Sequence, residues 1–214
     1  DLYGFLVNVD HEIPAPEIWN RLRFWTEQYM CAGENRTALF HDLVDEETAR
    51  LLEADRQDGF APPFCRKGCA GCCCQPVACT DEEAELMHSY CGRNGIPVDR
   101  GKLERQLRFM RFDQNGDFTG APEWDEQPEN DRSCVFLNAA DSSCMIWDVR
   151  PFVCRNQMAE STGEFCRPVK GEPDPRASAI QYAECSYILS AVFTVHHDSV
   201  GKMMARLLLN LGDT

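Results

Sequence analysis

The sequence predicts a mostly α-helical protein with a small β-hairpin, an α+β fold in which helices wrap an irregular, cysteine-rich core. Two observations lead to this expectation. Apolar residues recur at helical spacing in several segments, whereas six of the thirteen cysteines are gathered between Cys65 and Cys79, in a stretch that contains Gly68 and Gly71 and is typical of a loop. The chain has 214 residues, of which 43% are hydrophobic, so it is long enough to bury a core of its own.

Two helices are expected before the cysteine-rich loop. Between Pro14 and Cys31, four apolar residues recur at spacings of four, three and four, as on one face of a helix. They are Ile18, Leu22, Trp25 and Tyr29. The acidic run that begins at Asp45 suits the first turn of a second helix, which we expect to reach about Arg56, before Gly59 and two prolines.

Two further helices are expected after the loop. Thr80 and Glu83 form a capping-box pattern, which predicts a helix that begins there and ends at about Cys91, before two glycines. A second helix is predicted by apolar residues at helical spacing, namely Leu103, Leu107 and Met110. The cysteine-rich loop should therefore lead directly into helical structure.

Short strands are expected in the second half of the chain. Residues 111–118 contain Asn115-Gly116 and predict a tight hairpin, and residues 119–133 are expected to form an exposed connection. Two apolar runs, Cys134–Leu137 and Cys144–Trp147, are separated by a turn-rich hexapeptide and predict a second small hairpin. Each of these strands opens with a cysteine.

Helices are expected to close the chain. Pro151 is tolerated at the start of a short helix that carries Cys154, and apolar spacing predicts two more helices, over about 176–195 and 200–211. The predicted organisation has three parts: an N-terminal helical segment (1–60), a cysteine-cluster metal-binding domain (61–190) and a C-terminal packing helix (191–214).

The net charge and the hydropathy of the chain make nucleic acid and a membrane-spanning segment unexpected. The formal net charge is −14, and no basic stripe is present that would neutralise phosphates, so nucleic acid is not expected as a partner. The longest nearly apolar run, Tyr187 to Val195, is shorter than the roughly 20 residues that cross a bilayer. We therefore expect a soluble, cytoplasmic protein. The chain begins at Asp1 and not at methionine, which is consistent with removal of an upstream segment.

The cysteine pattern indicates metal coordination rather than a disulfide framework. The chain is long and has an odd number of cysteines, unlike small secreted disulfide-rich domains. Cys65, Cys69 and Cys72 follow one another at short intervals, so their thiolates can reach a common centre. Because adjacent side chains such as those of Cys72 and Cys73 leave the backbone in different directions, we expect either two sites or one cluster-sized site.

The candidate ligands are all thiols. Cys134, Cys144 and Cys154 are spaced by ten and ten, and the predicted hairpin and short helix can return them to the loop. With no histidine among the thiols, a closed zinc site and an iron-sulfur cluster both remain open, and the surplus of ligands slightly favours the cluster. Cys31 and Cys91 lie in helical patterns and are expected to be buried as small apolar residues.

Three ordered blocks of sequence resemble the cysteine-cluster family that is named for its CxxCxxCC motif and described as zinc- or iron-chelating. The first block holds Cys65, Cys69, Cys72 and Cys73, and the second is Cys134-Val-Phe-Leu137. The third, Cys144-Met-Ile-Trp-Asp-Val-Arg-Pro-Phe-Val-Cys-Arg155, is similar to the family's Cys-x-Ile-Tyr-x-x-Arg-Pro-x-x-Cys-Arg. The resemblance covers about residues 65–185. The chain departs from the pattern by an extra residue between the first two cysteines, by Trp147 in place of tyrosine, and by the additional Cys74.

The resemblance implies a metal centre and leaves its use open. The related flagellin lysine methylases resemble this chain only in the cysteine blocks and imply an iron-sulfur cluster, for example of the 4Fe-4S kind. The resemblance also raises the expectation that Arg150 and Arg155 lie beside the cofactor, where they would offset thiolate charge. Cys166 and Cys185 both remain candidates for the family's last cysteine. The full set of expected ligands is Cys65, Cys69, Cys72, Cys73, Cys134, Cys144, Cys154, Cys166 and Cys185.

Three functions follow from these expectations. The first is metal binding for electron transfer or metal handling, by an iron-sulfur cluster or zinc, with metal ions and an unidentified redox or protein partner. The second is a metal- or cluster-dependent enzyme related to the flagellin lysine methylases, whose catalytic residues the sequence does not indicate. The third is an interaction module that is stapled by structural zinc.

Overall fold

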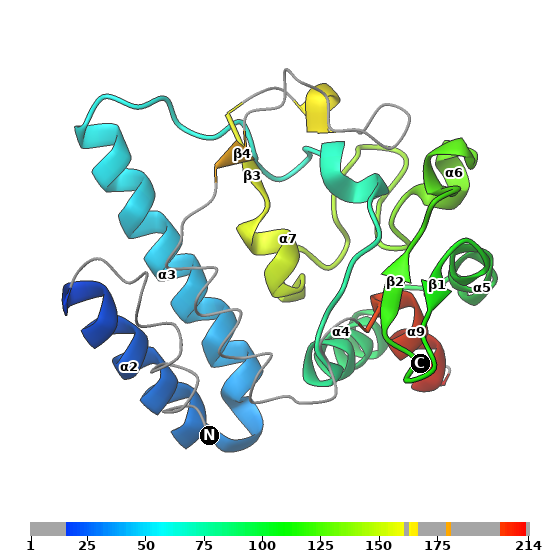
Figure 1. The fold of residues 1–214 in the computed structure, drawn as a ribbon, viewed down its shortest axis with the longest axis horizontal. Helices are drawn as coiled ribbons and strands as arrows, with labels where there is room; N and C mark the ends of the chain where they lie inside the picture. The colour runs from blue at the N-terminus through cyan, green and yellow to red at the C-terminus, as the bar shows by residue number, and fades with distance from the viewer. Residues whose placement is uncertain (1–15, 161–162, 167–178, 181–201, 213–214) are drawn as a thin grey trace.

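The computed structural model describes residues 16–160, 163–166, 179–180 and 202–212 and is mostly helical, with small antiparallel sheets, as the sequence predicts (Figure 1). The α-helices are α2 (Pro16–Cys31), α3 (Arg36–Gln57), α4 (Asp81–Asn94), α5 (Arg100–Arg108), α6 (Glu129–Arg132), α7 (Phe152–Asn156) and α9 (Met204–Asn210). Strand β1 (Arg111–Phe112) pairs with β2 (Phe118–Gly120), and β3 (Met158–Ala159) pairs with β4 (Ala179–Ile180). Short 3-10 helices include η2 (Gly71–Cys74), η3 (Trp124–Glu126), η4 (Trp147–Val149) and η5 (Gly163–Cys166).

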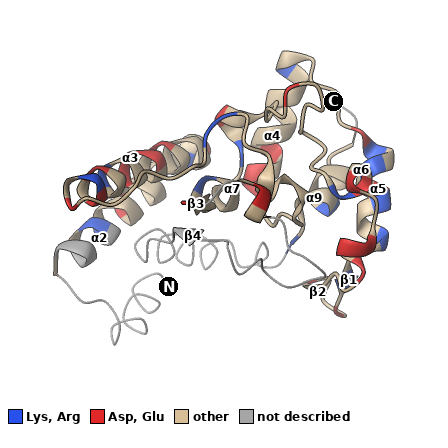
Figure 2. Ribbon diagram, turned by 90° about the horizontal axis from the view of Figure 1, so that it is seen from above, with Lys and Arg blue, Asp and Glu red and all other residues tan. Residues whose placement is uncertain are grey.

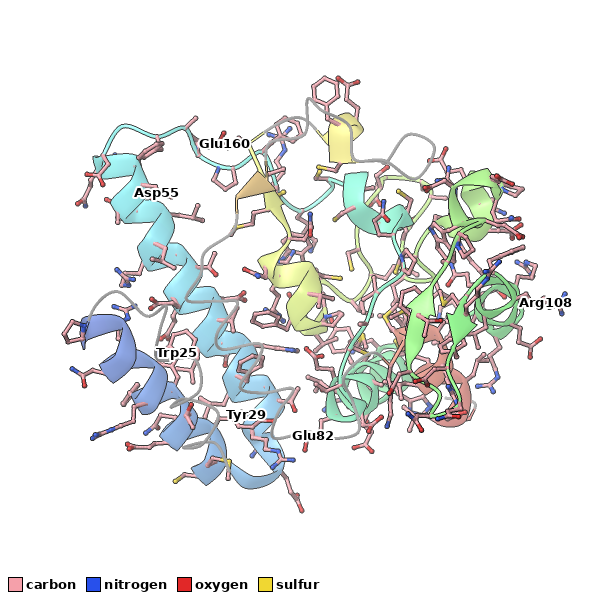
Figure 3. All side chains as sticks on the ribbon, in the orientation of Figure 1. Trp25, Tyr29, Asp55, Glu82, Arg108 and Glu160 are labelled. Atoms are coloured by element: carbon pink, nitrogen blue, oxygen red, sulfur yellow. The ribbon has the colours of Figure 1, made fainter. Side chains whose placement is uncertain are left out.

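Helices α2 and α3 lie side by side at one end of the molecule (Figure 1). Trp25 and Tyr29 of α2 are buried, as predicted, and face α3 (Figure 3), where the Tyr29 ring meets Phe40 edge-on at 5.8 Å. Basic and acidic residues both occur along α3 (Figure 2). The predicted start of α3 at Asp45 is wrong: the helix begins at Arg36, because its buried face already includes Phe40 and no breaking residue separates the two positions.

Helices α4, α5 and α9 gather at the other end (Figure 1) and share a core cluster. The predicted capping box is confirmed: the Thr80 hydroxyl accepts from the Glu83 amide at 3.1 Å, and the Glu83 carboxylate accepts from the Thr80 amide at 2.9 Å. Gly95 ends α4 in the left-handed conformation that glycine adopts without strain. The predicted last helix is confirmed as α9, which buries Leu207 and Leu208 in this cluster.

The predicted hairpin at residues 111–118 is confirmed as β1–β2. The connection after it is not simply exposed, because it includes α6 and because Trp124 is only 4% exposed. The Trp124 indole nitrogen donates to the Cys74 carbonyl at 2.7 Å. This segment therefore packs against the end of the cysteine-rich loop, which its acidic, proline-containing sequence did not reveal.

Two of the predicted elements in the second half are wrong. Residues 134–137 and 144–147 form a turn closed by one isolated bridge, Leu137 to Cys144, and not a pair of strands, because the second segment continues into η4. The predicted helix over 176–195 is wrong at Ala179–Ile180, which form strand β4, and its remainder lies outside the described residues. None of the helices in the described ranges is both long and apolar enough to cross a bilayer.

Candidate metal centre

Seven of the nine predicted ligand cysteines line one cavity between the helical ends of the molecule. Its volume is about 710 Å³, including the solvent at its open side. Sulfur atoms are visible between α7 and the group formed by α4, α5 and α9 (Figure 3). The lining contains no histidine or carboxylate among the described residues. The seven cysteines are Cys65, Cys69, Cys72, Cys73, Cys134, Cys144 and Cys154.

The cysteine-rich loop is shaped by two close backbone contacts. Gly68 has a φ of 91°, and the turn it belongs to is closed by a hydrogen bond from the Cys69 amide to the Arg66 carbonyl at 2.9 Å. Gly71 of η2 packs directly on the backbone of Gly163 in η5, so that a Cβ at Gly71 would overlap the Gly163 carbonyl. A Cβ at Gly163 would lie 2.8 Å from the Cys69 sulfur. Both positions therefore require glycine for steric reasons.

The loop is also anchored from two other elements. The Cys65 sulfur accepts from the amide of Ala159 in β3 at 3.2 Å. The Cys73 carbonyl accepts from the Cys134 amide at 2.6 Å. These two bonds hold the cysteine-rich loop, which precedes α4, against segments that follow it by some 60 to 90 residues in the sequence. The sequence pattern alone did not contain this pairing.

Cys154 is presented by α7, whose first residue is held by a buried network. The Phe152 amide donates to the Glu83 carboxylate at 2.6 Å, and the same carboxylate oxygen lies 2.9 Å from Nε2 of His41. The Phe152 ring stacks on Phe40 of α3 at 5.3 Å. Glu83 therefore serves two functions, as a capping residue of α4 and as the acceptor that fixes α7. Only the first was visible as a sequence pattern.

Burial is the main influence on most of the cavity thiols. It raises the pKa of Cys134 to about 11 and holds the pKa of Cys154 well above its ordinary value. The pKa of Cys72 is raised first by its hydrogen bond with Cys73 and then by burial. Because these thiols are protonated at neutral pH in the absence of metal, a metal that binds them as thiolates must release protons.

The two predicted arginines have different surroundings. Arg150 lines the cavity, and its guanidinium lies 3.6 Å from the centre of the Trp147 ring. Its Nε atom is buried and has no hydrogen-bond partner among the described residues. Arg155 does not line the cavity: it donates to the Asp45 carboxylate and to the carbonyl of Arg150 at 2.9 Å. Arg155 thus supports the backbone that carries Arg150.

The remaining cysteines are distributed in different ways. Cys166 is on η5, next to the loop thiols, and Cys185 lies outside the described residues. Cys74 is buried, and its thiol donates to the Gly71 carbonyl at 3.4 Å. Cys91 is fully buried in the core, as expected, whereas the expectation for Cys31 is wrong because this residue is exposed at the end of α2.

The donor set fits a thiophilic metal. The described cysteines form no disulfide, and clustered thiols without carboxylates suit zinc or an iron-sulfur cluster better than magnesium or calcium. In the described ranges no three histidine, cysteine or carboxylate side chains are already drawn together in a metal-holding group. Cys65, Cys69, Cys72, Cys73, Cys134, Cys144 and Cys154 are the residues that would hold the metal.

Comparison with models of protein families, with curated proteins and with solved structures finds no match to this chain. The resemblance to the cysteine-cluster family therefore stays a prediction that rests on the three sequence blocks.

Proposed function

We propose that the protein binds metal through its clustered cysteine thiolates, as an iron-sulfur cluster or as zinc, for electron transfer or metal handling. The observation that carries this proposal is the composition of the cavity wall, which has seven cysteines and no carboxylate or imidazole among its described residues. Packing of an apolar core does not require cysteines from a loop, a turn and a helix to line the same cavity. Coordination of a metal by thiolates does require such an arrangement.

The free thiols also indicate the cellular compartment in which the protein works. Thiols persist in a reducing environment and pair in an oxidising one. We therefore propose a cytoplasmic location, in which the cavity cysteines stay available for metal.

The wall of the cavity favours a second candidate, a metal- or cluster-dependent enzyme. The cavity is open to solvent and includes Arg150, a cation fixed on the Trp147 ring. An arginine beside a metal centre is suited to bind a carboxylate or phosphate group of a substrate. In this alternative at least one coordination position stays open, whereas a structural or electron-transfer centre has all of its positions filled by cysteine.

The test is a metal and spectral analysis of the full chain purified without oxygen. Iron, zinc and acid-labile sulfide are measured together with the visible absorption spectrum. A brown protein with iron and sulfide establishes an iron-sulfur cluster, and a colourless protein with zinc establishes a zinc protein. A chain that takes up neither metal, although its thiols are reduced, overturns the proposal.

A pair of variants separates a coordinating thiol from a packing thiol. Cys72→Ser removes a cavity thiol, and Cys74→Ser removes its neighbour in the same 3-10 helix, which is outside the cavity wall. We expect Cys72→Ser to lose metal and Cys74→Ser to keep it. Equal metal content in the two variants contradicts coordination by the cavity thiols.

A further inference from the structure

Arg150 is a cation without an acidic partner in a strongly acidic chain. The formal net charge is −14, and arginines elsewhere in the structure are paired with carboxylates, as Arg36 is with Glu82 and Arg105 with Asp131. Within the described residues, Arg150 forms no ion pair with a carboxylate, and its buried Nε atom has no acceptor. Its guanidinium therefore retains donors that an anion from outside the chain can occupy.

The backbone that carries Arg150 is held in place by a second arginine. Arg155 is buried, and its Nε atom donates to the Arg150 carbonyl at 2.9 Å. Its two Nη atoms donate to the Asp148 carbonyl and to the Asp45 carboxylate. Pro151 also restricts the backbone of the residue before it. The two arginines of this segment therefore differ: Arg155 has acceptors for its donors and fixes the chain, and Arg150 faces the cavity from that fixed chain.

The side chain of Arg150 is held as well. Its guanidinium lies 3.6 Å from the centre of the Trp147 ring. A cation–π contact of this kind orients the guanidinium and uses none of its N–H donors in hydrogen bonds. Because the backbone and the side chain are both fixed before a ligand arrives, little conformational entropy is lost when an anion binds.

The rest of the cavity wall is also suited to an anion. It includes a second arginine, Arg66, which is exposed and lies 5.1 Å from the centre of the Phe64 ring, and it includes no aspartate or glutamate among its described residues. The buried side chains of Phe136 and Ile146 form an apolar part of the wall. Because an apolar wall screens charge less than water does, an anion is attracted to arginine more strongly here than on the open surface.

We propose that Arg150 binds an oxyanion, a carboxylate or phosphate group, of a ligand that enters the cavity from its open side, with Arg66 as a second cation in the same wall. This inference deepens the proposed function and rests on it for the metal beside the anion. It adds the chemical class of the ligand and the residue that recognises it. The planar guanidinium presents N–H donors that match the oxygens of either group.

The test compares two alkylating reagents of similar size that differ in charge. Iodoacetate carries a carboxylate, and iodoacetamide is neutral. Both are added together, in equal amounts, to the full chain purified without oxygen and with any metal that it holds. After a brief reaction, peptide mapping counts the two products at each cysteine. Because both reagents attack the same thiolate, the ratio of their products does not depend on the fraction of that thiol that is protonated or metal-bound.

The exposed Cys31 at the end of α2 is the internal reference. We expect the ratio of iodoacetate product to iodoacetamide product to be about ten-fold higher at one or more of the seven cavity cysteines than at Cys31, as a charge-assisted hydrogen bond to the reagent would give. An excess of inorganic phosphate should lower the ratio in the cavity and leave the ratio at Cys31 unchanged. The same competition with acetate shows which of the two oxyanions binds better.

Variants assign the preference to Arg150. Arg150→Gln should lower the cavity ratio to the value at Cys31, and Arg150→Lys should keep part of the preference, because lysine retains the charge and loses the planar fork. The matched control is Arg108→Gln, which removes one positive charge from an exposed position on the outer side of α5 (Figure 3) and should leave the ratio unchanged. Iodoacetamide labelling and metal content in the same samples report whether each variant is folded.

The unsubstituted chain alone can overturn the proposal, so the test does not depend on the folding of a variant. Equal ratios in the cavity and at Cys31 would show that Arg150 only offsets thiolate charge. A cavity preference that persists in Arg150→Gln overturns the assignment to this residue. The metal content of the same sample decides the proposed function separately: a chain that contains metal and shows no preference refutes only this inference, and a chain that shows the preference without binding metal refutes the proposed function and retains the anion site.

Discussion

The helical region (α2–α5 and α9) and the thiol region (residues 65–74, 134–160 and 163–166) are held together in different ways. In the helical region, apolar side chains such as Val44 and Leu103 are fully buried, and the backbone bonds lie within the helices. In the thiol region the elements are short, and much of the contact is made by loops. Helices can be stable by packing alone, whereas short irregular segments around thiols need an additional source of order.

Under the proposed metal-binding function, this difference predicts how metal binding and folding depend on each other. The helical region supplies fixed points, such as Glu83 and Phe40, that hold α7 from outside. The thiol region lies against these points and has its own sulfurs as its inner lining. We therefore expect the helical region to fold first and the metal to order the thiol region afterwards.

Of the changes considered, removal of metal should produce the largest difference in stability between the helical region and the thiol region. Structural thiolate centres contribute on the order of 10 kcal/mol to folding, so a chelator should raise amide hydrogen exchange strongly in residues 65–74 and 134–160. Exchange in α3 should change little. Hydrogen exchange measured by mass spectrometry, with and without chelator, checks this prediction. Equal loss of protection in both regions would show that they fold as one unit.

Phe152→Ala should have the next largest effect, because this ring joins the two regions. It is 1% exposed and stacks on Phe40. Truncation of such a ring costs about 3–5 kcal/mol in the free energy of unfolding, and the displaced α7 should also lower metal affinity through Cys154. Urea denaturation and metal titration measure the two effects.

The matched control for Phe152→Ala is Phe24→Ala, which changes a phenylalanine that is 52% exposed on α2. Substitutions at such surface positions usually stay within about 0.5 kcal/mol. If Phe24→Ala lowered the free energy of unfolding as much as Phe152→Ala, burial of the Phe152 ring between the two regions would not explain its effect.

The sequence predicted the helical region better than the thiol region. The capping box of α4, the buried Trp25 and Tyr29 of α2 and the apolar face of α9 follow local patterns, and the structure confirms them. The bond from Cys134 to Cys73 and the contact of Gly163 with Gly71 join distant segments, and no local periodicity encodes them. The sequence nevertheless indicated seven cysteines that the structure brings to one cavity. Four of them are clustered in the loop, which is a local pattern, and the other three were indicated by their regular spacing and by the family resemblance.

Gly71→Ala tests whether close backbone contact is needed in the thiol region. The added methyl group would overlap the Gly163 carbonyl, and η5 would have to move away from the loop. Overpacking of this kind costs about 1–3 kcal/mol, and we expect weaker metal binding, since η5 packs on the loop that carries Cys69 and Cys72. Thermal denaturation and metal titration check both outcomes. An unchanged melting temperature and unchanged metal affinity would show that η5 moves without loss of stability.

Gly101→Ala is the counterpart in the helical region, and it should have the smallest effect, with the opposite sign. Gly101 lies in the first turn of α5, where an added Cβ would lie 3.4 Å from its nearest atoms, an ordinary contact distance. Alanine restricts the unfolded chain and favours the helix, so we expect a gain of roughly 0.5 kcal/mol and unchanged metal content. The same glycine-to-alanine change would then stabilise one region and disrupt the other. Thermal denaturation of the two variants side by side measures this contrast, and destabilisation by Gly101→Ala would contradict it.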